Sequence, residues 1–225
     1  MLRSWRSFAS SWRSLMVVAT TLTLLSSAGS AWSQDVPTVV QIEEDWELVI
    51  ADPDAGNAAP QITCTISPHK HLNNLHAVLE VNHKTVPYWA AGGVHLQTWA
   101  GEYNLTRRSL ESTAPLSTRG ETVRWTTRMS LWNNSLSFAI ANGTSTTWGN
   151  FGGSTLASSY GTSLTSLNSY SPEFSVRNSG VGFASNRVQS LVLKRVRYKL
   201  ANGDVLTDDS PRVIHQSAVQ LEPEP

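Results

Sequence analysis

The chain has 225 residues, and its 17 lysine and arginine residues balance 17 aspartate and glutamate residues. It contains one cysteine, and 15% of its residues are charged. These counts exclude a nucleic-acid binder with a strongly basic surface, a disulfide-built miniprotein and a multi-pass membrane protein. A zinc site built from several cysteines is excluded as well, because one thiolate cannot supply it.

The first 33 residues have the pattern of an export signal. Three arginines precede an uncharged run of 11 residues at 15–25, and Ala31-Trp32-Ser33 fits a cleavage site before Gln34. A membrane-spanning helix needs about 20 apolar residues, which favours cleavage over anchoring. We therefore expect a protein that is secreted or held in the cell envelope, with no membrane span after cleavage. Loss of the three arginines leaves 14 basic residues against 17 acidic ones.

The remaining sequence has a period of two rather than a helical period. Apolar and polar residues alternate at 77–82, 94–99 and 123–132, which is typical of strands with one buried face. Asn133-Asn134 and Asn202-Gly203 separate alternating runs and predict tight hairpin turns. Further strands are expected at 42–50, 61–67, 136–140, 181–184, 190–200 and 205–206. We predict one all-β domain over 34–212, an antiparallel β-sandwich.

Three other segments have predictable places in such a fold. At 151–175, 11 of 25 residues are Ser or Thr, which predicts a surface loop or edge strands with small side chains. Residues 213–225 are expected to form a flexible C-terminal tail. Cys64 alternates with Ile62 and Ile66, which predicts a buried thiol that packs as a small hydrophobe.

Part of the chain resembles a known fold family. Residues 121–149 contain a strand, an Asn-Asn turn, a second strand and an Asn-Gly turn at 142–143. Val181-Gly182-Phe183 precedes the closing strand at 191–198. This arrangement resembles the concanavalin A-like lectin/glucanase sandwich, which implies a jelly roll whose concave face often binds glycans. The sequence is also similar to an uncharacterised family of secreted bacterial proteins, which implies no activity.

One motif has the residue types of an enzyme. Glu43, Asp45 and Glu47 fall on one face of a strand and resemble the E-x-D-x-E motif of laminarinase-type glycoside hydrolases. That resemblance implies a nucleophile at Glu43, an acid/base at Glu47 and a tuning role for Asp45. Retaining hydrolysis needs two carboxyl groups about 5–5.5 Å apart. The alternative, which we favour, is an acidic edge strand that resists edge-to-edge pairing.

A second set of residues suggests binding. Polar and aromatic side chains on the outward faces of the alternating runs would suit a sugar, whose C–H groups stack on aromatic rings while amides and charges bond its hydroxyls. The predicted ligand-binding residues are Glu80, Asn82, His95, Gln97, Trp99, Arg124 and Arg128. The alternative is that the indoles cap the core or that a second layer covers this face.

No sequence pattern points to a cofactor or a metal. His69-Lys70-His71 has ligand-like spacing, but no Asp or Glu lies between 55 and 79 to complete a site. We expect a non-catalytic sandwich that binds a glycan or a cell-envelope component, and no nucleic acid. The alternatives are a glycoside hydrolase and a structural envelope protein without a small ligand.

Overall fold

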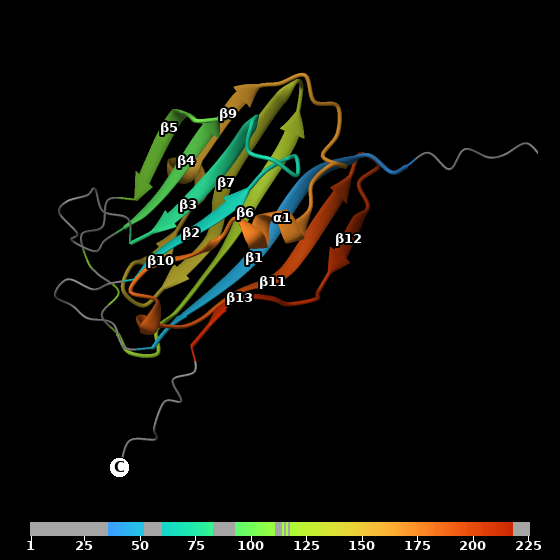
Figure 1. Cartoon of the computed structure of the whole chain (residues 1–225). Helices are drawn as coiled ribbons and strands as arrows, with labels where there is room; N and C mark the ends of the chain where they lie inside the picture. Colours follow the sequence, from blue (N-terminus) through green and yellow to red (C-terminus); the bar gives the residue numbers. More distant parts are fainter. Residues whose placement is uncertain are drawn as a thin grey trace, which may run out of the picture. The chain divides into compact units, whose positions relative to one another are not determined.

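The computed structural model describes residues 36–51, 60–82, 93–110, 114, 116 and 118–217. These residues form two antiparallel β-sheets packed face to face (Figure 1), so the predicted all-β sandwich is confirmed. The predicted export signal at 1–33 lies outside the described residues. Within the described part of the chain, no helix has the length and apolar character needed to cross a bilayer.

The larger sheet, sheet A, follows the order β12-β11-β1-β6-β7-β8, and β13 and β9 pair additionally with β11 and β7. Its strands are β1 (Val39–Ile50), β6 (Thr122–Trp132), β7 (Ser135–Ser145), β8 (Gly149–Phe151), β9 (Ala157–Gly161), β11 (Val188–Leu200), β12 (Val205–Asp208) and β13 (Arg212–Gln216). β1, blue in Figure 1, lies between β11 and β6. The expectation of an acidic edge strand is therefore wrong.

The smaller sheet, sheet B, has the order β10-β2-β3-β4-β5. Its strands are β10 (Gly180–Phe183), β2 (Gln61–Ile66), β3 (Leu75–Val81), β4 (Val94–Ala100) and β5 (Tyr103–Leu110). Short helical turns, η1 (Gly153–Leu156), α1 (Pro172–Arg177) and η2 (Ser185–Arg187), lie between the later strands. β5 was not predicted, because six of its eight side chains are exposed and it shows no apolar alternation.

The core lies between the two sheets and follows the predicted alternation. Trp46 and Trp125, from neighbouring strands of sheet A, stack with ring centroids 6.2 Å apart and planes within 6°. Leu79 and Leu96 of sheet B belong to the same buried cluster. Cys64 is also buried there, and burial raises the pKa of its thiol well above the usual value, so its predicted role as a small hydrophobe is confirmed.

Positive backbone φ angles distinguish a turn from a bulge in the β6–β7 region. Asn133 and Asn134 have φ values of 46° and 56° and form the predicted tight turn of the hairpin. The Asn-Gly pair at 142–143, predicted as a turn, lies instead within β7. It inserts one extra residue opposite the β6 segment between Arg124 and Thr126, and Asn142 takes a φ of 52°. A β-carbon at Gly143 would lie 2.3 Å from the Phe151 ring, so only glycine fits.

The C-terminal segment differs from its prediction. Residues 212–216 form β13 and pair with β11, so the flexible tail predicted from residue 213 is wrong for 213–216. Ile214 packs partly buried against the core, which stabilises this short strand. The Ser/Thr-rich segment 151–175 contains η1 and β9, and β9 pairs with β7 as an edge strand of small side chains, one of the two predicted arrangements.

Candidate functional site

The outer face of sheet A carries a network of charges centred on β1. Glu43, Asp45 and Glu47 point away from the core, because Ile42, Glu44, Trp46 and Leu48, the residues between and beside them, are buried on the other face. The prediction that the three carboxylates share one face is thus confirmed.

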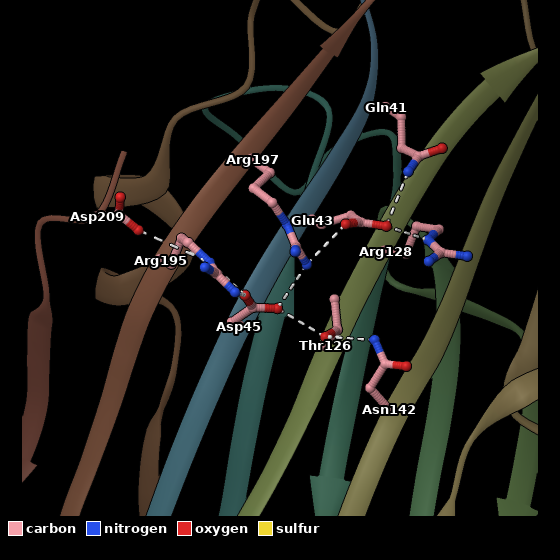
Figure 2. Close-up of polar contacts among 9 residues, drawn as sticks. All are labelled: Gln41, Glu43, Asp45, Thr126, Arg128, Asn142, Arg195, Arg197 and Asp209. Carbon is pink, nitrogen blue, oxygen red and sulfur yellow. Dashed lines mark hydrogen bonds and ion pairs between the residues drawn. The ribbon is translucent and has the colours of Figure 1, made fainter. Parts of the chain in front are cut away.

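Glu43 and Asp45 are engaged by basic side chains from the neighbouring strands (Figure 2). Glu43 pairs with Arg128 at 2.7 Å and with Arg197 at 2.9 Å. Asp45 accepts hydrogen bonds from Arg195, Arg197 and the Thr126 hydroxyl, at 2.8, 3.1 and 2.8 Å. Bonding to Asp45 raises the pKa of Arg195.

Glu47 completes the network at the other end of β1. It pairs with Arg124 of β6 at 2.8 Å and with Lys194 of β11 at 3.5 Å. The basic residues thus come from two strands that are hydrogen-bonded to β1 on either side. Cross-strand neighbours in a sheet lie close enough for such contacts.

Two β-bulges shape the middle of this face. In β11, Arg195 and Leu193 pair with the consecutive residues Asp45 and Trp46, so Lys194 is an extra residue. The bulge lets Lys194 and Arg195 both reach β1 carboxylates, although adjacent residues of a regular strand point to opposite faces. In β7, the second bulge brings the Asn142 amide to the Thr126 hydroxyl at 3.3 Å.

A shallow hollow of about 380 Å³ lies between the two bulges. Its lining includes the charged side chains of Asp45, Glu47, Arg124, Lys194, Arg195 and Arg197, with Thr126 and Asn142. The carboxylate side chains of the lining, Asp45 and Glu47, are only 19% and 22% exposed, whereas the side chains of Arg124 and Lys194 are 60% and 50% exposed. The hollow therefore has an acidic floor and a basic rim.

This arrangement is unfavourable for glycosidase chemistry. A general acid must carry a proton, and a nucleophile needs an accessible lone pair. Here the proposed pair, Glu43 and Glu47, forms close ion pairs with guanidinium groups, which balance the negative charge and occupy carboxylate oxygens. The central position of β1 and the shared face of its three carboxylates do agree with an enzyme.

The predicted ligand-binding set is divided between the two sheets. Arg124 and Arg128 lie on the outer face of sheet A, and the residues predicted from β3 and β4 lie on the outer face of sheet B. Because the core separates these faces, they cannot contact one small ligand together. On sheet B, the Gln97 amide donates to Glu80 and accepts from Asn104, and its side chain is 3% exposed.

The remaining sheet B residues occupy different environments. His95 is half-buried, with its Nδ1 3.3 Å from the Ser109 hydroxyl, and the indole of Trp99 is half-buried. Asn82 is 1% exposed, has a φ of 55° and donates to the Pro60 carbonyl at 3.0 Å. Asn82 therefore holds the end of β3, and its burial leaves almost no surface for a ligand contact.

The structure adds residues to the site that sequence reasoning missed. Lys194, Arg195 and Arg197 form a Lys-Arg-x-Arg run in β11, and this run was the available signal. Trp132, at the end of β6, is 76% exposed and lies on the same face as Arg128, which is four residues earlier in the strand. An exposed indole of this size is uncommon and suits stacking on a sugar ring.

His69 and His71 lie side by side in the segment between β2 and β3. The rings of His69 and His71 stack with centroids 4.9 Å apart, and burial together with His71 lowers the pKa of His69. Over the described ranges, no group of three or more His, Cys, Asp or Glu side chains is placed to hold a metal ion.

No family model matches the chain, and no curated protein matches its sequence.

Proposed function

We propose that the protein is an exported, non-catalytic binding protein that takes a glycan on the outer face of sheet A. The observation that carries the proposal is the hollow between the two bulges, where fixed donors and acceptors alternate over a few ångströms. Sugar hydroxyls both donate and accept hydrogen bonds, so such a surface matches them. Export, to the envelope or beyond it, rests on the pattern of residues 1–33.

The neighbouring surface supports a chain-like ligand rather than a small molecule. β7 and β9 present small side chains beside Arg124 and Arg128 of β6, among them Ser137, Ala139 and Ser159. A flat strip of this kind leaves room for an extended ligand that leaves the hollow toward Trp132. The resemblance of the sequence to jelly-roll sandwiches agrees with glycan binding, but the proposal does not depend on it.

A glycan array tests the proposal with two matched tryptophan variants. Trp132→Ala removes the exposed indole of the sheet A face, and Trp99→Ala removes the indole of the sheet B face. We expect the Trp132 variant to lose binding and the Trp99 variant to keep it. Absence of binding by the unmodified protein across plant, algal and bacterial glycans would refute the proposal, and loss only in the Trp99 variant would move the site to sheet B.

A glycoside hydrolase is the second candidate, because β1 lies inside sheet A. This function would be preferred if the unmodified protein released reducing ends from β-glucans and the Glu43→Gln variant did not. Since the Glu43 carboxylate is held by two arginines, we expect no such release.

A further inference from the structure

We infer that the glycan is anionic, with carboxylate or sulfate groups that the basic rim of the hollow recognises. This inference rests on the proposed function and specifies its ligand class. Three observations support it: the exposure of the charged side chains on sheet A, the number of basic and acidic groups, and the bulge in β11.

The exposure of each side chain determines which charged groups a ligand contacts first. Glu43, Asp45 and Glu47 lie low on the face, while Arg124, Arg128, Lys194 and Arg195 are 40–60% exposed above them. An approaching chain therefore contacts ammonium and guanidinium groups before the three carboxylates of β1. A guanidinium binds a carboxylate or sulfate through two parallel N–H donors, which a neutral hydroxyl cannot match.

The number of charges leaves a positive surplus. Within the described network, five basic side chains surround three carboxylates, and each carboxylate already contacts two of the basic groups. Asp209 lies 4.0 Å from Arg195 and is 74% exposed, and Lys199 follows Arg197 on the same face of β11. The carboxylates hold the basic groups in place, which lowers the entropy cost of binding an anion.

The β11 bulge concentrates this surplus at the hollow. The extra residue, Lys194, pairs with Glu47, and its neighbour Arg195 pairs with Asp45. Two consecutive basic side chains therefore lie on the outer face of sheet A. Without the bulge, one of the two would point into the core. The bulge thus adds a positive charge where the hollow lies.

Other features favour a glycan over a nucleic acid, which is also a polyanion. The whole chain has equal numbers of basic and acidic residues, whereas phosphate-backbone binding needs an extended basic surface. The rim is a local group of cations next to hydroxyl and amide groups, Thr126 and Asn142. A sugar chain with one acidic group per unit fits this mixture.

Isothermal titration calorimetry on the full chain tests the inference with matched oligosaccharides. The probes are an oligogalacturonate with its carboxyl-reduced neutral counterpart, and a sulfated galactan oligosaccharide with its desulfated counterpart; these arms separate carboxylate from sulfate recognition. We expect at least one acidic probe to bind about tenfold or more tightly than its neutral partner, a difference of about 1.4 kcal/mol. Binding of the acidic probe should weaken as the salt concentration rises from about 0.05 M to about 0.5 M, because mobile ions screen the exposed charges of the rim.

The double variant Arg124→Gln/Lys194→Gln should lose about tenfold or more in affinity for the acidic probe, on the scale of charge-assisted bonds. Both side chains are at least half exposed, so the fold should survive, and the melting temperature checks this. Arg107→Gln, an exposed arginine on β5 of sheet B, is the matched control and should bind as the unmodified protein does.

The outcomes separate the two proposals. Equal binding of acidic and neutral partners would overturn the anionic ligand and retain glycan binding on sheet A. Failure of every oligosaccharide would overturn both. Tighter binding of a deoxythymidine oligonucleotide than of any acidic sugar, or equal loss in the Arg107 control, would overturn recognition of an anionic glycan at this hollow.

Discussion

The phenol of Tyr170 donates a 2.7 Å hydrogen bond to Oε1 of Glu44, although 126 positions separate the two residues. The Trp46 indole donates to the other carboxylate oxygen at 3.1 Å. Glu44 is the one inward-facing acidic residue of β1 and is fully buried. Burial raises the pKa of its carboxyl to about 7, while the hydrogen bonds from Tyr170 and Trp46 lower it in part. Glu44 therefore couples the stability of the fold to pH.

The first prediction concerns Glu44→Gln. The folded protein holds a proton on Glu44 between about pH 4.5 and 7 that the unfolded chain releases. The protonated Glu44 carboxyl thus contributes its full stabilisation below pH 4.5, and this stabilisation is lost as pH rises through about 7. The loss lowers the free energy of unfolding by on the order of 3 kcal/mol. The glutamine side chain of the variant is neutral at every pH, so urea denaturation should show the variant gaining stability relative to the unmodified protein from about pH 4.5 to about pH 8.

The difference between the two proteins isolates Glu44 from other titrating groups. Around the carboxyl, Arg212 lowers its pKa, while Cys64 and Tyr170 have pKa values raised well above the usual range and stay neutral here. The pKa of Asp208, held at about 2 by Arg212, affects stability only at lower pH and in the opposite direction. A stability difference that stays constant across the same pH range would contradict the prediction.

The second prediction compares the two stacked tryptophans of the core. The Trp46 indole N–H bonds Glu44, whereas that of Trp125 is buried with no hydrogen-bond partner in the described structure. Replacing either by Phe leaves a similar cavity. Trp46→Phe should cost about 1–2 kcal/mol more than Trp125→Phe, because only the first leaves a carboxyl oxygen without its donor. Urea midpoints measure both, and a larger cost at Trp125 would contradict this reasoning.

The third prediction concerns Asn82 at the end of β3. Asn82→Gly keeps the left-handed backbone and loses the bond to Pro60, at a cost of about 1 kcal/mol. Asn82→Ala should cost about 1 kcal/mol more, because alanine disfavours a φ of 55°. Thermal unfolding measures the order, and neither change should alter glycan affinity in the folded protein. An affinity loss in stable Asn82→Gly would restore Asn82 as a ligand contact.

The strands could be predicted where one face is buried. At 123–132 the alternation identifies both the strand and its inner face, with Val123, Trp125 and Met129 in the core. It fails at β5, whose edge position leaves both faces exposed, and at β13, which is held by pairing with β11 more than by its own pattern. Asn142-Gly143 misled because a bulge and a turn both require positive φ.

The candidate site could be predicted only in part. Alternation placed Glu43, Asp45 and Glu47 on one face, but it cannot show which strand lies beside β1. The arginines of β11 follow about 150 positions later, so their ion pairs depend on long-range pairing. For the same reason, the outward residues of β3 and β6 look equivalent in sequence although they belong to opposite sheets.

The pairing of β1 with β11 also constrains when the protein can fold. Val39 lies opposite Leu200, so the centre of sheet A joins the first and last parts of the described chain. A nascent polypeptide cannot close that sheet until β11 has been synthesised, about 150 residues after β1, and long-range pairing of this kind is slow. For a protein that we propose to be exported, such delayed closure would keep the newly made chain unfolded and able to pass through a translocation channel.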